Sequence, residues 1–273
     1  MLEKVDLGDV QLEYEVHGTG EPVILIHGSV AADTYLPMLS EPSVSRYKLV
    51  RYRRRGFGNS THPTSIISIR DQANDCRALM RELNIERAHV VGHSYGGVIA
   101  LQLALDCPDA VHSLALLEPA LVRFTTTAAE FTGGMASVIE TYQKGDRRGA
   151  LEGFFRQGAG PDWRRSFNAI PGSLEMALAD IDTFFHVEIP AMSEWRFTRD
   201  DAARISQPLL TVVGGKSAPF LYEVQKLVQS WFAQAQTATI PGSDHMLQAV
   251  EPHALAEVLF RFWQSVPIGQ AAG

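Results

Sequence analysis

The chain has 273 residues, of which 45% are hydrophobic and 20% are charged, an ordinary composition for a protein with a large buried core. Its 24 basic and 31 acidic residues give a net charge of −7, which argues against a general affinity for nucleic acid or for anionic membranes. The first residues do not have the pattern of a secretory signal, and no apolar run is long enough to span a bilayer, so a cytoplasmic protein is expected.

The beginning of the chain predicts strands. Residues 2–16 alternate loosely between apolar and polar side chains, which indicates an antiparallel hairpin that turns near Gly8 and Asp9. The apolar run 22–26 is typical of a central strand that is covered on both faces. Residues 31–45 are weakly helical and contain two prolines, so a short irregular segment is expected there.

Another strand is predicted at residues 47–52, and it leads into a run of arginines. The run could bind an anion, but a solvated strand exit is favoured in a chain that is acidic as a whole. Its members are Arg51, Arg53, Arg54 and Arg55. Residues 67–83 carry apolar side chains at helical spacing, which predicts an amphipathic helix against the sheet.

The stretch around Ser94 indicates a strand, a tight turn and a helix. An apolar run enters the turn, and a segment of small and apolar residues, 98–105, leaves it. A turn that lifts a serine hydroxyl to the top of a sheet brings backbone segments together, so side chains at Gly92 and Gly96 would collide. Ser94 then stands at a helix N-terminus, where the N–H of Tyr95 favours developing negative charge. The pattern indicates a nucleophile, with a simple packing turn as the alternative.

The remaining strands and helices complete an alternating pattern. Strands are predicted at residues 111–117, 208–213 and 237–240, and helices at 220–232 and 252–263. This alternation implies a parallel sheet wound by right-handed crossovers. Ligands of such sheets gather at the carboxyl ends of the strands, and those ends carry His27, Ser94 and Glu118.

Between residues 122 and 205 the pattern changes to helical stretches rich in Phe, Trp and Met. So long a segment between two strands is best explained as a helical cap inserted over the sheet. The predicted division is a core domain of residues 1–121 and 206–273 and a cap domain of residues 122–205. The cap's aromatic residues are candidates to line a substrate pocket, although most are expected to form the cap's own core. They are Phe154, Phe155, Trp163, Phe184, Phe185 and Trp195.

Over essentially its whole length the chain resembles the α/β-hydrolase fold family. Four motifs in the expected order carry the resemblance: Ile26-His27-Gly28-Ser29, Arg55-Gly56-Phe57-Gly58-Asn59-Ser60, Gly92-His93-Ser94-Tyr95-Gly96-Gly97 and Gly242-Ser243-Asp244-His245. The resemblance implies an α/β fold with a doubly wound, mostly parallel eight-stranded sheet and an inserted helical cap.

The resemblance also implies the roles of the site residues. Ser94 would be the nucleophile, His245 the general base, and the backbone N–H groups of Ser29 and Tyr95 the oxyanion hole. His27 is assigned to the turn that shapes the oxyanion loop. His93 lies inside the tight turn and is expected to point elsewhere.

The catalytic acid departs from the commonest pattern of the family. Most members carry an aspartate shortly after the strand predicted here at 208–213, and in this chain that position holds Ser217. A neutral hydroxyl can orient an imidazole but cannot stabilise its positive charge. Glu118 is predicted to take over, because some relatives, including certain haloalkane dehalogenases, carry the acid there and because a buried anion needs a partner. The alternative is that Glu118 is only a charge at the cap entrance.

The sequence therefore predicts a serine hydrolase that cleaves a small or medium carboxylic ester or lactone through an acyl-enzyme. No metal or organic cofactor is implied. The expected partner is a small-molecule carbonyl substrate, not nucleic acid or a membrane, and a homodimer is left open.

Three other functions are considered. In this family the same three catalytic side chains also serve C–C bond hydrolysis and cofactor-free perhydrolase chemistry. A ligand-binding receptor with little turnover is supported only by Ser217 standing in place of the aspartate. The dehalogenases and epoxide hydrolases of this fold use an aspartate as nucleophile, which Ser94 disfavours.

Overall fold

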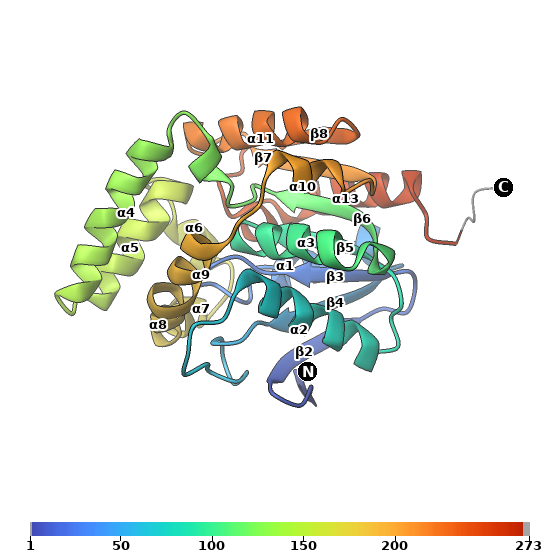
Figure 1. Ribbon diagram of the computed structural model, residues 1–273, viewed down its shortest axis with the longest axis horizontal. Coiled ribbons are helices and arrows are strands. Elements are labelled where there is room, and N and C mark those ends of the chain that lie inside the picture. The colour runs from blue at the N-terminus through green and yellow to red at the C-terminus, as the bar shows by residue number, and fades with distance from the viewer. Residues whose placement is uncertain (1, 270–273) are drawn as a thin grey trace.

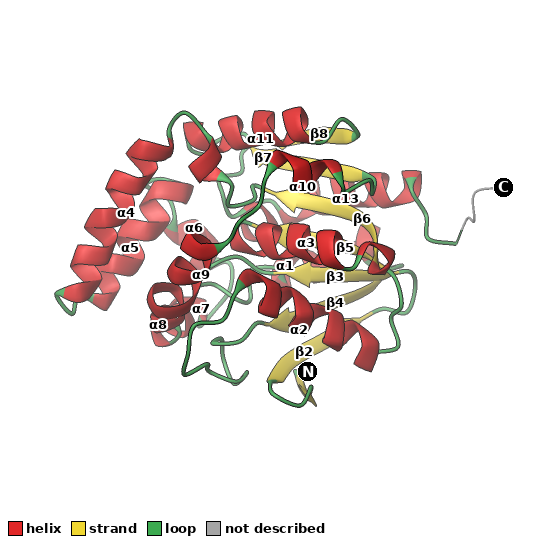
Figure 2. Ribbon diagram, viewed as in Figure 1, coloured by secondary structure: helices red, strands yellow, loops and turns green. Residues whose placement is uncertain are grey.

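The computed structural model describes residues 2–269, which form one sheet with helices on both faces and further helices gathered at one end (Figure 1). Figure 2 shows that the strands lie together in the middle of the molecule. Within the described range, no helix has both the length and the apolar character needed to cross a membrane.

The sheet formed by the described residues has eight strands. They are β1 (Glu3–Asp6), β2 (Gln11–His17), β3 (Pro22–Ile26), β4 (Lys48–Arg53), β5 (Ala88–His93), β6 (Val111–Leu117), β7 (Leu209–Gly214) and β8 (Ala235–Ile240). Their order across the sheet is β1-β2-β4-β3-β5-β6-β7-β8. Strand β2 runs antiparallel to β1 and β4, and the other neighbours are parallel. The predicted doubly wound, mostly parallel sheet is confirmed.

The strand order places a binding crevice at β3. From β3 the chain crosses to β4 on one side and then returns to β5 on the other side. Where successive connections leave a parallel sheet in opposite directions, the loops at the carboxyl ends separate and leave room for a ligand. The loops after β3 and β5 contain Ser29 and Ser94, so this crevice lies where the sequence predicts the chemistry.

Both faces of the sheet are apolar in the central strands, because successive side chains of a strand point to opposite faces and consecutive residues there are apolar. In β3, Ile24 and Ile26 belong to one buried cluster, and Val23 and Leu25 belong to the other. The first cluster is covered by α2 (Ile69–Glu82), α3 (Tyr95–Asp106) and α11 (Pro219–Trp231). The second is covered by α1 (Leu36–Leu39), α12 (Leu247–Val250) and α13 (Pro252–Ser265).

Between β6 and β7 the chain forms helices only. We call residues 122–205 the cap segment. Its helices are η3 (Val122–Phe124), α4 (Ala128–Gln143), α5 (Arg147–Ala159), α6 (Arg164–Asn168), α7 (Ser173–Ala179), α8 (Ile181–Thr183), η4 (Phe184–Glu188), α9 (Ile189–Glu194) and α10 (Arg199–Ala203). A third apolar cluster joins this segment to Val30 and Met246, which lie in loops beyond β3 and β8.

The arginine run, which begins in β4 and continues just beyond it, is not a solvated strand exit, so the sequence expectation is wrong. Three of the four arginines are buried, and each of the four pairs with carboxylates of the protein, since a buried guanidinium needs an opposite charge. The pairs are Arg51 with Glu15 and Asp33, Arg53 with Glu13 and Asp33, Arg54 with Glu188, and Arg55 with Asp75 and Asp9.

Candidate active site

Ser94 occupies a strained turn between β5 and α3. Its φ is 51° and its ψ is −116°, a conformation that a residue with a side chain rarely adopts. The Ser94 N–H donates to the Leu117 carbonyl at 2.9 Å, and the Ser94 carbonyl accepts from the N–H groups of Gly97 and Ala120 at 2.9 and 3.0 Å. These three bonds hold Ser94 at the carboxyl end of the sheet.

The two glycines that flank Ser94 are required by close backbone contacts. A Cβ atom on Gly92 would lie 2.4 Å from the Gly96 carbonyl oxygen. A Cβ on Gly96 would lie 2.3 Å from the carbonyl oxygen of Ile26. Both distances are shorter than any normal contact, so the turn packs against β3 only because these residues lack side chains.

Glu118 connects the strand after Ser94 to the predicted base. Its Oε2 accepts a hydrogen bond from Nδ1 of His245 at 2.5 Å. Its Oε1 accepts from the Gly214 N–H at 2.7 Å and from the Ser217 hydroxyl at 2.5 Å. The Glu118 side chain is fully buried, and three donors offset the cost of burying its charge. Glu118 therefore contacts the histidine directly, and Ser217 contacts Glu118 and not the histidine.

His93 has a part in the site that the sequence analysis missed. Its Nε2 lies 2.8 Å from the His245 carbonyl oxygen, and the two ring centroids are 4.7 Å apart. Burial holds the pKa of His93 well below its usual range, so the ring is neutral and its Nε2–H donates to that carbonyl. The expectation that His93 points elsewhere is wrong, because the loop after β8 folds back over the end of β5.

The loop after β3, the predicted oxyanion loop, has a defined shape. The Ala31 N–H donates to the Ser29 carbonyl at 2.7 Å, which makes a γ-turn centred on Val30 with a φ of 68°. His27 donates from Nδ1 to the Gly28 carbonyl and accepts at Nε2 from the Arg54 N–H. Burial, together with the nearby Arg54 charge, holds the pKa of His27 well below its usual value, consistent with a neutral ring that shapes this loop.

Arg54 ties the oxyanion loop to the cap segment. Its guanidinium donates to the carbonyls of His27 and Gly28 at 3.3 and 2.9 Å and to Oε1 of Gln72 at 2.7 Å. It also forms an ion pair with Glu188 of the cap segment. Along the sequence Arg54 is only one member of an arginine run, since its partners are distant along the chain.

A cavity of about 510 Å³ lies between the carboxyl edge of the sheet and the cap segment. Ser29, Ser94, Tyr95, Glu118 and His245 all line it, so the predicted catalytic residues meet in one cavity. Its wall is mostly apolar and includes α4 residues that the sequence analysis did not select. These are Phe131, Met135 and Ile139, whose spacing of four residues places them on one helix face.

Only some of the predicted cap aromatics reach this cavity. Phe154, Phe155 and Phe184 line it. The other three candidates, Trp163, Phe185 and Trp195, do not line it, so they are wrong as substrate-binding residues, and both tryptophans are used for internal packing. Trp163 is fully buried and packs against Phe155 and Phe167, with ring centroids 5.9 and 5.6 Å away. Trp195 stacks on Phe197 and donates from Nε1 to Gln102 at 2.8 Å.

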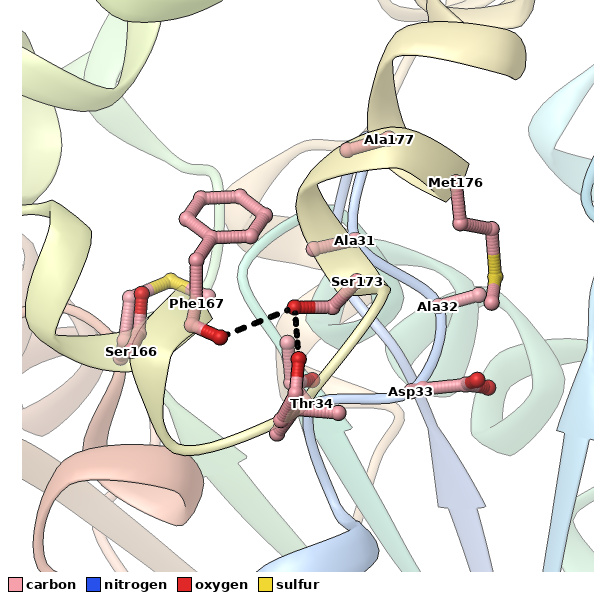
Figure 3. A pocket seen from close by; sticks show the side chains of 11 residues that line it. Ala31, Ala32, Asp33, Thr34, Ser166, Phe167, Ser173, Met176 and Ala177 are labelled. Carbon is pink, nitrogen blue, oxygen red and sulfur yellow. Dashed lines mark hydrogen bonds between the residues drawn. The ribbon is translucent and has the colours of Figure 1, made fainter.

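A second, much smaller cavity lies beside the first, between the loop at residues 31–34 and helices α6 and α7 (Figure 3). Its volume is about 10 Å³. The Ser173 hydroxyl at its wall donates to the carbonyls of Phe167 and Ile170, and Figure 3 shows the bond to Phe167. A space of this size holds at most about one water molecule, so the larger cavity is the candidate substrate site.

Comparisons with known proteins agree with this architecture. The sequence model of the alpha/beta hydrolase fold matches residues 21–252, most of the chain. Fluoroacetate dehalogenase from a Burkholderia species is 38% identical over 127 residues, which are 44% of this chain and 42% of that protein. The chain spans less than half the length of the first curated relatives that it matches.

Two solved structures share the fold over nearly their whole length. A thermophilic esterase from Thermogutta terrifontis has a TM-score of 0.82 at 21% identity, covering 97% of this chain and 99% of its own. The enol-lactonase from Burkholderia xenovorans LB400 has a TM-score of 0.74 at 19% identity, covering 96% of this chain and 100% of its own. At such identities the likeness concerns the fold alone.

Proposed function

Since the chain belongs to the α/β-hydrolase fold family, we propose that it is a serine hydrolase that cleaves a small or medium carboxylic ester or lactone. The observation that carries this proposal is the hydrogen bond between Glu118 and His245 in the cavity that Ser94 lines. A serine hydroxyl near neutral pH is a weak nucleophile and needs a base oriented by a third group.

In the proposed first step, the Ser94 hydroxyl oxygen forms a bond to the substrate carbonyl carbon while His245 takes its proton at Nε2. The positive charge that develops on His245 is balanced by Glu118, which stays ionised. The negative charge that develops on the substrate oxygen is stabilised by the N–H groups of Ser29 and Tyr95. The attack produces a tetrahedral intermediate. Its collapse breaks the bond to the leaving alcohol, which receives the proton from His245. The acyl group remains on Ser94.

In the second half, water repeats the same chemistry. His245 takes a proton from the water, whose oxygen attacks the acyl carbon, and the bond to Ser94 then breaks with return of the proton to Ser94. Water must reach the acyl group. A cavity with polar side chains beside Ser94 and apolar walls elsewhere suits this reaction. Phe154, Phe184 and Met135 are apolar residues of the cap segment that would contact the acyl or alcohol group.

The substitution at Ser217 does not weaken this proposal. Ser217 and the Gly214 N–H both donate to one oxygen of Glu118, which leaves the other oxygen directed at His245. The hydroxyl thus supports the displaced acid. A receptor with little turnover is less well supported, because its one argument was the missing aspartate.

The proposal is tested with a fluorophosphonate probe, which phosphonylates activated serines, and with p-nitrophenyl esters of rising chain length. The wild-type protein should become labelled and should hydrolyse the shorter esters, and both signals should disappear in Ser94→Ala. No labelling and no ester turnover in the folded wild-type protein would contradict the proposal. Parallel assays of diketone cleavage and of peracid formation from hydrogen peroxide distinguish the alternative activities.

A further inference from the structure

Glu188 is a buried carboxylate on the wall of the candidate substrate cavity that the proposed triad does not use. It is the last residue of η4, a π-helical turn between α8 and α9, and its exposed fraction is 1%. A π-helical turn inserts an extra residue and re-aims the side chains around it, and such turns are frequent at functional sites. Here the helix brings a charged side chain to a mostly apolar cavity.

The two oxygens of Glu188 have different surroundings. Oε1 forms the ion pair with Arg54, and Oε2 has no hydrogen-bond partner among residues 2–269. Burial raises the pKa of Glu188, whereas Arg54 and the nearby Ser29 hydroxyl favour its ionised form. The Ser29 hydroxyl lies near the carboxylate and helps to hold its pKa down, while Oε2 itself has no hydrogen-bond partner among the described residues. A buried carboxylate oxygen without a donor costs free energy, and a donor supplied by a ligand would offset that cost.

Several other polar groups of the cavity wall are engaged within the protein. Glu118 is bound by its three donors, and the Tyr95 hydroxyl accepts from Gln72. Arg123 donates to the carbonyls of Met192 and Trp195. The Nδ1 atom of His93 also lacks a partner, but it packs directly beneath Gly28, where a Cβ would lie 2.8 Å away. Glu188 therefore stands apart as a charged acceptor in the cavity wall.

We propose that Glu188, next to Ser29, forms a subsite that accepts a hydrogen bond from a neutral donor on the substrate, a hydroxyl or an amide N–H near the scissile carbonyl. The donor is placed near the carbonyl because Ser29 both adjoins Glu188 and supplies the proposed oxyanion N–H. The donor is neutral because the Arg54 guanidinium already balances the carboxylate charge. This inference rests on the proposed hydrolase function.

The test compares substrates that differ only in the donor. Ethyl 3-hydroxybutanoate is paired with ethyl 3-methylbutanoate, in which a methyl group replaces the hydroxyl. The α-acetamido derivative of γ-butyrolactone is paired with its α-(2-oxopropyl) analogue, in which CH₂ replaces N–H. Hydrolysis is followed by titration of the released acid. The wild-type protein should prefer the donor in at least one pair by about 10- to 100-fold in kcat/KM, as expected for a hydrogen bond to a charged group, and that pair identifies the donor.

The variant Glu188→Gln removes this preference without removing the partner of Arg54. The amide oxygen can still accept from Arg54, and the NH₂ group then replaces the free acceptor with a donor. The preference should fall at least tenfold. Glu188→Met, which removes both acceptors at similar volume, should also abolish it. Gln72→Met is the matched control, because Gln72 binds Arg54 and the Tyr95 hydroxyl without lining the cavity: the absolute rate can fall in this variant, whereas the ratio between paired substrates should persist.

The outcomes separate this inference from the proposed function. If the wild-type protein hydrolyses ethyl 3-methylbutanoate and labels with the fluorophosphonate but shows no donor preference, the Glu188 subsite is refuted and the hydrolase stands. The same holds if a preference exists and Glu188→Gln retains it. If neither labelling nor hydrolysis occurs, the hydrolase proposal fails, and the subsite as a part of it fails too.

Discussion

Backbone strain in this protein is concentrated at the candidate site. Among residues 2–269, four non-glycine residues have a positive φ, and three of them, Val30, Ser94 and Glu118, belong to the proposed oxyanion loop, the turn of the proposed nucleophile and the proposed acid. Such conformations cost on the order of 1–3 kcal/mol each and persist only where surrounding contacts hold them. The Glu118 N–H, for example, donates to the Val212 carbonyl at 3.1 Å. The groups are thereby oriented before any substrate arrives.

The roles of Glu118 and Ser217 give a prediction at the scale of single residues. Glu118→Gln keeps the shape of the side chain but removes the charge that balances a protonated His245, so kcat should fall by about 10³- to 10⁴-fold. Ser217→Ala removes one of three donors to Glu118 and should lower kcat by about tenfold or less, since one hydrogen bond to a charged group is lost.

Steady-state kinetics on a p-nitrophenyl ester measure both effects, with the thermal unfolding midpoint of each variant as the control for folding. A larger loss in Ser217→Ala than in Glu118→Gln would show that the hydroxyl, and not the carboxylate, is the group on which His245 depends.

At the scale of elements, the packing of α3 against β3 decides where Ser94 stands. The helix begins one residue after Ser94, and its first turn touches the end of β3 through Gly96. The length of α3 is buried between the sheet and its neighbours, so the turn cannot move away to accept a side chain. The position of Ser94, the proposed nucleophile, is therefore coupled to the packing of a whole helix.

The two substitutions Gly96→Ala and Gly133→Ala separate this packing from helix propensity. A methyl group on Gly96 would meet backbone at 2.3 Å, so the free energy of unfolding should fall by about 2 kcal/mol or more, as for other overpacked core sites. Gly133 lies within α4 with open space around it, and the same substitution there should stabilise the protein by about 0.5–1 kcal/mol.

Urea unfolding followed by far-UV circular dichroism measures both changes. Equal effects of the two substitutions, in either direction, would mean that the close approach of α3 to β3 does not restrain the turn in solution.

At the scale of the whole molecule, three buried histidines make stability depend on pH. Burial holds the pKa values of His27 and His93 well below the usual range and lowers the pKa of His89 to about 4. In the unfolded chain these rings bind protons near pH 6.5. At a pH between the folded-state pKa values of these histidines and 6.5, the folded protein binds fewer protons than the unfolded chain. The stabilising contribution of the neutral histidines is therefore complete above pH 6.5 and is lost as the pH falls toward the folded-state pKa values.

His89 allows this linkage to be measured away from the candidate site. It lies at the start of β5, where it contacts Ser113 and Glu21. From pH 8 to pH 5 its contribution should fall by on the order of 1–2 kcal/mol, and His89→Phe should reduce the total pH-dependent loss by that amount. Urea midpoints at half-unit pH intervals supply the measurement. An unchanged slope in the variant would show that His89 is not held neutral in the folded protein.

The sequence by itself determined the fold class and the tight turn that carries Ser94. These depend on local patterns: apolar periodicity over the strands, and the glycines that let the backbone pass close to Ser94. Such effects act within about ten residues and are nearly independent of what lies elsewhere in the chain. The motifs after β3 and β8 were recognisable for the same reason.

Only the tertiary structure decided which charged and aromatic side chains meet. Arg54 pairs with Glu188, 134 residues away, and Glu118 with His245, 127 residues away. The run of arginines looked solvated because its carboxylate partners lie in other segments, and Trp163 and Trp195 looked like pocket residues because their neighbours were unknown. A buried charge or ring is defined by what the fold brings around it, and a pattern along the chain does not contain that information.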